Sequence, residues 1–143
     1  MINDVLITSL DIIKTPNGSV LHALKKNEKS FVGFGEAYFS EIEYNSVKAW
    51  KRHKEMTLNL CVPIGKIRFV LYDDRNEQNC KYQEFVISKE NYCRLTIPPM
   101  IWLGFQGLAK DASMLLNIAN IMHNANEVDR KNIDEIQFDW RLD

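Results

Sequence analysis

The stretch VKAWKRHKEMTLNLCVPIGKIRFVLYDD, from Val47 to Asp74, holds two short runs rich in β-branched and apolar residues. The runs are Thr57 to Val62 and Lys66 to Asp73, and the turn between them is Pro63-Ile64-Gly65. Runs of this length and composition, bounded by Pro and Gly, are typical of strands. The stretch therefore predicts a β-hairpin near the middle of the chain.

A single histidine, His53, precedes this hairpin inside a cluster of positive side chains, which are Lys48, Lys51, Arg52 and Lys54. An imidazole titrates near neutral pH and can move a proton, while clustered cations suit a polyanionic small molecule. A surface histidine in a solvated charge run would give the same pattern. Alternate residues of an extended segment face opposite sides, so the four cations cannot all face one ligand.

The length and composition are those of an ordinary globular protein. The 143 residues suffice for a full hydrophobic core, so a single domain over residues 1–143 is expected. The net charge of −1 gives no reason to expect nucleic acid or a membrane as a partner, and no apolar run approaches the roughly 20 residues of a membrane span. Three cysteines without a CxxC motif, and no recognisable secretion signal, predict a cytoplasmic protein with reduced thiols.

Further strand-like runs are separated by turn residues along the rest of the chain. They are Val5 to Ile13, Ser19 to Leu24, Gly35 to Ile42, Glu84 to Ser88, Cys93 to Ile97, and Trp102 to Leu108. Many short strands with closely spaced turns predict an all-β sandwich or barrel. The segment Met114 to Met122 is the exception, because its apolar residues alone have the spacing of a helix. In the polar tail from Asn124 to Asp143, Trp140 is the expected anchor.

Several motifs along most of the chain resemble the dTDP-4-dehydrorhamnose 3,5-epimerase family, small cupin-type barrels that act on nucleotide-linked 4-keto sugars. These motifs are Thr15-Pro16-Asn17-Gly18, Glu36-Ala37-Tyr38-Phe39-Ser40, Val47-Lys48-Ala49-Trp50 followed by His53, Gly65 to Arg75, and Ile97 to Phe105. The resemblance implies an all-β, cupin-like jelly-roll barrel, and it makes Met114 to Met122 a strand. It also implies a homodimer held by sheet-to-sheet contacts.

The chain departs from the family pattern at several functional positions. Asn17 stands where the family has a phosphate-binding arginine, and Leu103 replaces the histidine before Gly-Phe. The family's tyrosine proton donor falls at Met122 or His123, and the aspartate that supports the catalytic histidine has no clear counterpart. These departures predict a narrower reaction than full 3,5-epimerisation.

The metal-binding pattern of cupins is also incomplete. Its ligand positions align with Lys51, His53, Leu58 and Leu103, so only one of the four is a histidine. A divalent ion needs more ligands than this. The barrel is therefore expected to hold no metal and to need no cofactor.

The resemblance assigns His53 as the catalytic base, and the charges of Lys51 and Arg52 should lower its pKa and keep it neutral. A second proton-transfer group is sought among His123, Tyr38 and Tyr72, and His123 is selected because it lies beside the lost tyrosine. Water could also serve.

The expected substrate-binding residues are Lys48, Lys51, Lys66, Arg68, Tyr38, Glu36, Tyr72 and Trp102. Lys66 and Arg68 can bind substrate only if their strand face lines the barrel lumen. In the alternative orientation this face points outward, and Ile67, Phe69 and Leu71 form the core. The tryptophans equally fit a packing role.

The sequence thus predicts a metal-independent isomerase, an epimerase acting at C3, C5 or both on a nucleotide-linked 4-keto-6-deoxy sugar in cell-surface polysaccharide synthesis. Two alternatives stay open. One is a sugar-nucleotide 3,4-ketoisomerase, and the other is a non-catalytic sugar-nucleotide-binding cupin that has lost the proton donor. An epimerase needs two proton-transfer groups on opposite sides of the sugar ring, whereas a same-face isomerase can work with one.

Overall fold

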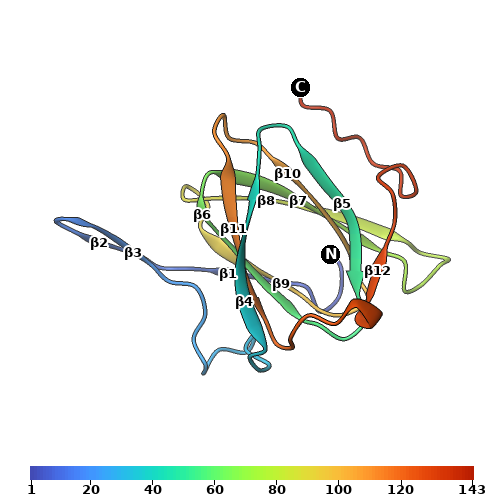
Figure 1. Cartoon of the computed structure of the whole chain (residues 1–143), viewed down its shortest axis with the longest axis horizontal. Helices are drawn as coiled ribbons and strands as arrows, with labels where there is room; N and C mark the ends of the chain where they lie inside the picture. The colour runs from blue at the N-terminus through green and yellow to red at the C-terminus, as the bar shows by residue number, and fades with distance from the viewer.

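The computed structural model describes residues 1–143, which form two five-stranded antiparallel sheets and a separate two-stranded arm (Figure 1). The β4 sheet has the order β1-β9-β6-β11-β4, with strands at Leu6–Ser9, Cys93–Ile97, Leu58–Ile64, Ser113–Ala119 and Glu36–Ile42. The β5 sheet has the order β12-β5-β10-β7-β8, with strands at Val128–Arg130, Val47–His53, Trp102–Gly107, Lys66–Asp73 and Lys81–Ser88. Consecutive strands such as β4 and β5 lie in different sheets, as in a jelly roll.

The all-β architecture predicted from the sequence is confirmed. The only helical segment is the short 3-10 turn η1 (Ala125–Glu127), and the segment around Met114 to Met122 forms β11, as the resemblance implied. Residues on both faces of β11 are partly or fully buried, so its apolar residues do not alternate and imitate helical spacing. The structure contains no helix with the length and apolar character that a membrane crossing requires.

The predicted hairpin between β6 and β7 is wrong in its pairing. β6 pairs with β9 and β11, whereas β7 pairs with β8 and β10, so the chain passes from one sheet to the other at Gly65. Gly65 has a φ of 84°, and a Cβ at this position would lie 2.3 Å from Ser113 Oγ. The Ser113 hydroxyl accepts a hydrogen bond of 3.0 Å from the backbone N–H of Lys66. A Pro and Gly signal marks a change of direction, but it does not distinguish a hairpin turn from a corner between sheets.

The hydrophobic core lies between the two sheets and is built from alternate residues of their strands. On β7, Ile67, Phe69 and Leu71 are fully buried in this core, where they meet residues of the β4 sheet such as Leu60 and Leu95. Burying an apolar side chain of this size stabilises the fold by about 1.5–3 kcal/mol. The inward face of β7 is therefore the apolar one, and the face that carries Lys66 and Arg68 points outward.

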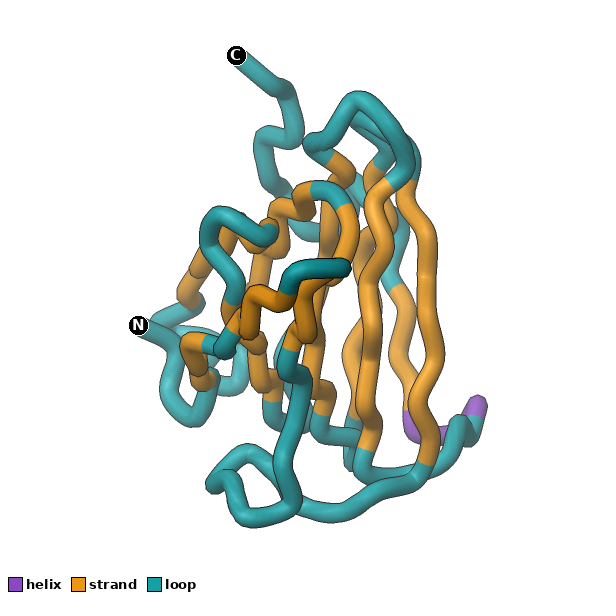
Figure 2. The backbone as a smooth tube through the Cα atoms, turned by 90° about the vertical axis from the view of Figure 1, so that its left-hand side faces the viewer, coloured by secondary structure: helices purple, strands orange, loops and turns teal.

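The C-terminal tail covers the outer face of the β5 sheet. Trp50, Trp102, Val70 and Ile136 form a second buried cluster there, and Phe138 and Trp140 pack against it. The ring centroid of Trp140 lies 5.4 Å from that of Trp50. Trp140 is thus the anchor expected from the sequence. Figure 2 shows the body turned by 90°, with most strands running between loops at its two ends.

The arm consists of β2 (Ile12–Thr15) and β3 (Gly18–Leu21) and projects from the body (Figure 1). Its turn is the predicted Thr15-Pro16-Asn17-Gly18. At its base the Tyr92 hydroxyl donates a hydrogen bond of 2.7 Å to the carbonyl of His22. The apolar side chains Ile13 and Val20 are about half exposed on the arm, at 49% and 52%.

Candidate active site

A cavity of about 650 Å³ takes its walls from both sheets. The β4 sheet contributes Tyr38, Ser40, Leu58, Leu60, Leu115 and Asn117, and the β5 sheet with the segment after it contributes Lys48, Ala49, Trp50, Lys51, His53, Leu103, Phe105, Arg130, Lys131, Asn132 and Glu135. Hollows of this size, partly apolar and with a few convergent polar groups, are the usual form of a small-molecule site. The cavity also contains the predicted base, His53.

The side chain of His53 is buried, and its Nδ1 donates a hydrogen bond to the carboxylate of Glu127. Local structure brings the two residues together. Asn124 caps the η1 turn by accepting from the N–H of Asn126, and β12 then pairs with the end of β5 so that Val128 lies opposite His53. The backbone N–H of Lys54 also donates to the Glu127 carbonyl at 2.7 Å.

The contact with Glu127 fixes the tautomer of His53. An ionised carboxylate can only accept hydrogen bonds, so the proton of the neutral imidazole must sit on Nδ1. Nε2 is then left with its lone pair, and the ring lines the cavity. This is the arrangement that a general base requires, because the carboxylate both orients the ring and stabilises the imidazolium formed after proton transfer.

The pKa of His53 is lowered from its ordinary value, as the sequence predicted, but the main cause differs. Burial contributes most, because it penalises the charged imidazolium, and the hydrogen bond and charge of Glu127 oppose it. The positive charge of Lys51 adds a smaller lowering. Arg52, which was expected to contribute, points to the other side of the strand. His53 is therefore unprotonated at neutral pH.

Glu127 is kept ionised by its hydrogen bonds. Burial by itself would raise its pKa, but hydrogen bonds from His53 and from the backbone N–H groups of Glu55 and Met56 outweigh it. The pKa of Glu127 is therefore lowered from its ordinary value. A buried carboxylate with this set of donors holds its charge, so it can act as the partner of the imidazole.

Positive side chains line the cavity around His53. Lys51 lies on the same face of β5, and burial followed by the charge of Arg130 lowers its pKa, while Glu127 and Glu36 act in the opposite direction. Lys48 donates a hydrogen bond of 2.7 Å from Nζ to the carbonyl of Glu41. Arg130 also lines the cavity, so the lining is positively charged, and Glu135 is its only acidic side chain. Lys131 contributes to the lining too, but its ammonium lies 4.9 Å from the ring of Trp102, on the outer side of the sheet.

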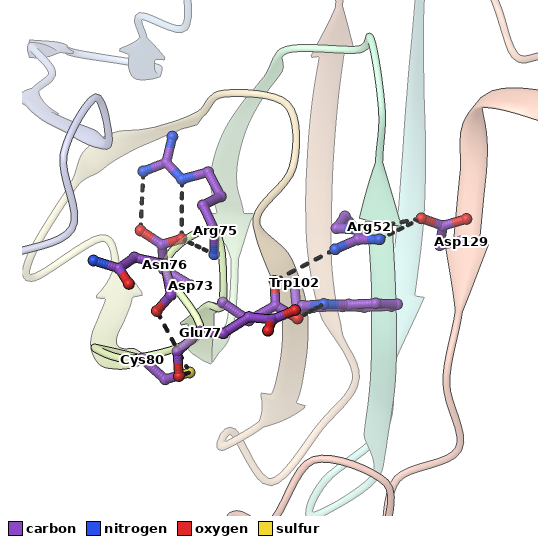
Figure 3. A network of polar contacts seen from close by, with 9 residues as sticks. Arg52, Asp73, Arg75, Asn76, Glu77, Cys80, Trp102 and Asp129 are labelled. Atoms are coloured by element: carbon purple, nitrogen blue, oxygen red, sulfur yellow. Dashed lines mark hydrogen bonds and ion pairs between the residues drawn. The ribbon is translucent and has the colours of Figure 1, made fainter.

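Arg52 lies between Lys51 and His53 in the sequence but points away from the cavity. Its guanidinium donates two hydrogen bonds to Asp129 Oδ2, at 3.1 and 2.7 Å, and stacks 4.6 Å from the ring of Trp102 (Figure 3). Asp74 lies 3.4 Å from the same guanidinium. The cationic cluster seen in the sequence is therefore divided between the two faces of β5.

A tyrosine and an amide face the cavity from the β4 sheet. Tyr38 on β4 and Asn117 on β11 lie opposite each other in the register of the sheet, and Asn117 Nδ2 donates a hydrogen bond of 3.0 Å to the Tyr38 hydroxyl. Asn117 is 3% exposed, and its Oδ1 has no hydrogen-bond partner. Because buried polar atoms are almost always paired, this oxygen is available to accept a hydrogen bond from a ligand or a water molecule.

The structure brings together His53, Lys48, Lys51 and Tyr38, and it places the remaining predicted residues elsewhere. Lys66, Arg68, Tyr72, Trp102, His123 and Glu36 do not line the cavity. Lys66 is exposed beside the Gly65 corner, and Arg68 pairs with Glu84 on the outer face. Trp102 is buried in the outer aromatic cluster, where it donates to Asp74, and Tyr72 stacks on Tyr82. His123 is exposed, and Glu36 is half-buried near Lys51.

Sequence reasoning did not identify Glu127, Asn117, Arg130 or Lys131. Glu127 lies in a tail that was interpreted only as polar, although Asn124 followed three residues later by Glu127 is the signature of a capped helical turn. Asn117 lies in the segment Met114 to Met122, which was interpreted only from the spacing of its apolar residues. Arg130 and Lys131 join the site because β12 pairs with β5, a pairing of three residues that leaves little trace in sequence. No group of three or more His, Cys, Asp or Glu side chains is arranged to hold a metal ion.

No protein-family model matches the chain, but individual relatives do. A dTDP sugar isomerase from Desulfovibrio desulfuricans is 35% identical, with a TM-score of 0.92 over 96% of this chain and 91% of that chain. The "Probable low-salt glycan biosynthesis epimerase Agl13" of Haloferax volcanii is 27% identical over 136 residues, which are 92% of this chain and 87% of that protein.

Solved structures of lower identity share the fold. The dTDP-4-dehydrorhamnose 3,5-epimerase of Elizabethkingia anophelis is 15% identical, with a TM-score of 0.77 over 99% of this chain and 83% of that chain. A sugar 3,4-ketoisomerase from Thermoanaerobacterium thermosaccharolyticum has the same fold. These likenesses confirm the jelly-roll barrel, which therefore supports more than one kind of isomerisation.

Proposed function

Because the chain belongs to the dTDP-4-dehydrorhamnose 3,5-epimerase family of cupin-type sugar-nucleotide isomerases, we propose that it epimerises a nucleotide-linked 4-keto-6-deoxy sugar. The observation that carries the proposal is the buried pair of His53 and Glu127 in the wall of a positively lined cavity. The sequence relative from Haloferax volcanii, which carries the name "Probable low-salt glycan biosynthesis epimerase Agl13", supports a role in the synthesis of surface polysaccharides.

The chemistry follows from the 4-keto group of such a sugar. The ketone acidifies the C–H bonds at C3 and C5, and Nε2 of His53 removes one of these protons to leave an enolate. Glu127 stabilises the imidazolium that forms. Lys51, on the same face of β5, supplies the positive charge proposed to hold the negative oxygen of the enolate. Donors aimed at a developing oxyanion usually supply a large part of the catalysis.

The cations at the cavity supply the binding energy for the diphosphate. Lys48 and Arg130 line the same hollow as His53, whereas the two predicted cations on β7 do not. Hydrogen bonds from charged donors to a phosphate are each worth about 1.5–3 kcal/mol. If the diphosphate of the substrate is bound through these residues, the attached sugar ring can reach the catalytic base His53.

The proposal is tested by solvent exchange. Wild-type protein incubated in D₂O with a dTDP-linked 4-keto-6-deoxyglucose should incorporate deuterium at C3 or C5, followed by NMR. His53→Asn should lower the exchange rate by about 100-fold or more, because it removes the base. His22→Asn is the matched control, since His22 lies at the base of the arm and outside the cavity, and it should exchange at the wild-type rate. Wild-type protein that exchanges neither proton would contradict the proposal.

The product separates the reaction types that the sequence left open. Inversion at C3 or C5 identifies an epimerase, and migration of the ketone from C4 to C3 identifies a ketoisomerase. Binding of the substrate without exchange identifies a non-catalytic protein. The last alternative rested on the missing proton donor and the missing supporting carboxylate, and the hydrogen bond between His53 and Glu127 supports a catalytic role over it.

We also propose that the enzyme is a cytoplasmic homodimer. The outer face of β4 exposes Phe39 at 62%, and Phe34 just before this strand is 65% exposed, which is unusual for large apolar side chains that remain in water. All three cysteines are unpaired, which is typical of a reducing compartment. Sedimentation analysis should give the mass of two chains, and Phe39→Asp should shift the protein towards the monomer.

A further inference from the structure

The cavity has a polar wall opposite the one that carries His53. His53 lies on β5, whereas Tyr38 and Asn117 lie on β4 and β11 of the other sheet, and all three line the same hollow. Inversion of a carbon requires that one group remove a proton from one face of the sugar and another group return a proton to the opposite face. Because the two walls belong to different sheets, a group on each wall can approach the sugar ring from opposite faces.

The hydrogen bond between the two polar residues leaves the phenol proton free. Asn117 Nδ2 donates to the Tyr38 oxygen at 3.0 Å, so the hydroxyl hydrogen can be given to another group. The same contact stabilises the phenolate that remains after the proton has left. In this orientation Asn117 Oδ1 is buried without a partner and can accept a hydrogen bond from the substrate. With the amide turned by half a turn, Oδ1 would instead accept the phenol proton of Tyr38 and the nitrogen would lack a partner, so the free phenol proton requires the orientation that the structure shows.

We propose that Tyr38 is the second proton-transfer residue and that Asn117 positions it while binding a hydroxyl of the sugar. This inference rests on the proposed function, because it assigns a role within the same reaction. His53 takes the proton from the carbon next to the ketone, and the electron pair of the C–H bond moves to the ketone oxygen as an enolate. When the enolate collapses, the Tyr38 hydroxyl gives its proton to the same carbon on the other face. His53 then releases its proton to solvent and Tyr38 takes one up.

The other candidates for this role lie in the wrong places. Tyr72 is on the outer face of β7 and stacks on Tyr82, and His123 is exposed and does not line the cavity. Lys51 lines the cavity but shares the strand and the face of His53, so it reaches the sugar from the same wall. Tyr38 is the phenol in the lining of the cavity, and it lies on the opposite sheet.

The test separates proton exchange from inversion. Tyr38→Phe removes one oxygen and keeps the ring, so the fold should be retained, with a melting temperature near that of wild type. His53 still works in this variant, so deuterium should still enter the substrate on the original face. Formation of the inverted sugar should fall by about 100-fold or more, in the range typical for loss of a general acid. Tyr44→Phe is the matched control, because Tyr44 is 55% exposed outside the cavity, and it should invert at the wild-type rate.

Asn117→Leu provides an independent measurement. If Asn117 positions Tyr38, this variant should lose inversion more than exchange, whereas a purely structural role would reduce both rates equally. Inversion at the wild-type rate by Tyr38→Phe would overturn the assignment of Tyr38 while the proposed epimerase stands. A wild-type protein without any exchange would overturn both. Exchange retained with inversion lost would support the assignment.

Discussion

Glu127 accepts a hydrogen bond from Nδ1 of His53, although 74 positions separate the two residues along the chain. Both side chains are buried, at 4% and 6% exposure. The pair stands in place of the histidine and aspartate pair that the family resemblance led us to expect and that the sequence did not reveal. The carboxylate comes from the turn before β12, so the site is completed only when this short strand joins the edge of β5.

Replacing Glu127 by Gln should lower turnover by about 10- to 100-fold, the usual cost of losing the group that supports a functional histidine. The amide oxygen can still accept from Nδ1, but it carries no charge to stabilise the imidazolium. Steady-state kinetics should show the loss in kcat, with a small change in KM. Glu135→Gln, which changes an exposed acid at the cavity, is the control and should lower kcat much less. Equal losses in the two variants would show that Glu127 is not the partner of the base.

The acid side of the pH profile should lie below the ordinary pKa of histidine, because burial lowers the pKa of His53. The active form is the unprotonated imidazole, so kcat/KM should fall to half of its maximum at a pH below 6.5. Glu127 opposes the effect of burial, so its replacement by Gln should move the decline to still lower pH. The measurement is kcat/KM from pH 4.5 to 8, roughly the span in which an imidazole titrates. A decline centred above pH 6.5 would contradict this account.

Nucleoside diphosphate binding should depend on the cations in the cavity and not on those of β7. We expect dTDP to raise the melting temperature, because a ligand that binds only the folded state stabilises it. Arg130→Gln and Lys48→Gln should each weaken the affinity by about 10-fold, the equivalent of one charge-assisted contact. Lys66→Gln removes the same charge outside the cavity and is the matched control. A reduced thermal shift for Lys66→Gln alone would place the nucleotide elsewhere.

Activity should survive removal of metal ions. The Nδ1 atom of His53 is already engaged with Glu127, and the other aligned ligand positions hold lysine and leucine side chains. Dialysis of the active enzyme against a strong chelator should therefore leave kcat unchanged, and elemental analysis should find no stoichiometric transition metal. Restoration of lost activity by one added divalent ion would contradict the prediction.

Arg94, which lies outside the cavity, should contribute strongly to the stability of the fold. Its side chain is fully buried beneath the loop after the arm, where it donates to Glu28 Oε2 at 2.7 Å, to Ser30 Oγ at 2.6 Å and to the carbonyl of Ala23. Arg94→Ala removes these partners together, so we expect a loss of about 3–5 kcal/mol in the free energy of unfolding. Urea denaturation measures this loss. Arg141→Ala, which breaks an exposed ion pair with Asp139, should leave the urea midpoint close to that of wild type.

The sequence by itself determined the class of fold and singled out His53 as the candidate base. Short runs of β-branched residues with Gly and Pro between them predict strands whatever the tertiary fold. Strand formation depends on local backbone conformation and on the alternation of apolar and polar residues. Strand β9 has the predicted limits of Cys93 and Ile97, and β10 begins at the predicted Trp102. His53 could be selected because it is one of three histidines and stands in a motif that matches the family at fixed spacing.

Only the tertiary structure decided which strands pair and which faces point inward. The same turn at Gly65 would fit a hairpin or a corner between sheets, and the packing of Ile67, Phe69 and Leu71 into the core settled the orientation of β7. Asn117 reaches the cavity, and Glu127 reaches His53, through strand pairings that join residues far apart in the chain. Such pairings are selected by the burial of the whole core rather than by local preference. A single sequence therefore reveals where strands begin and end more readily than it reveals the partners that complete the site.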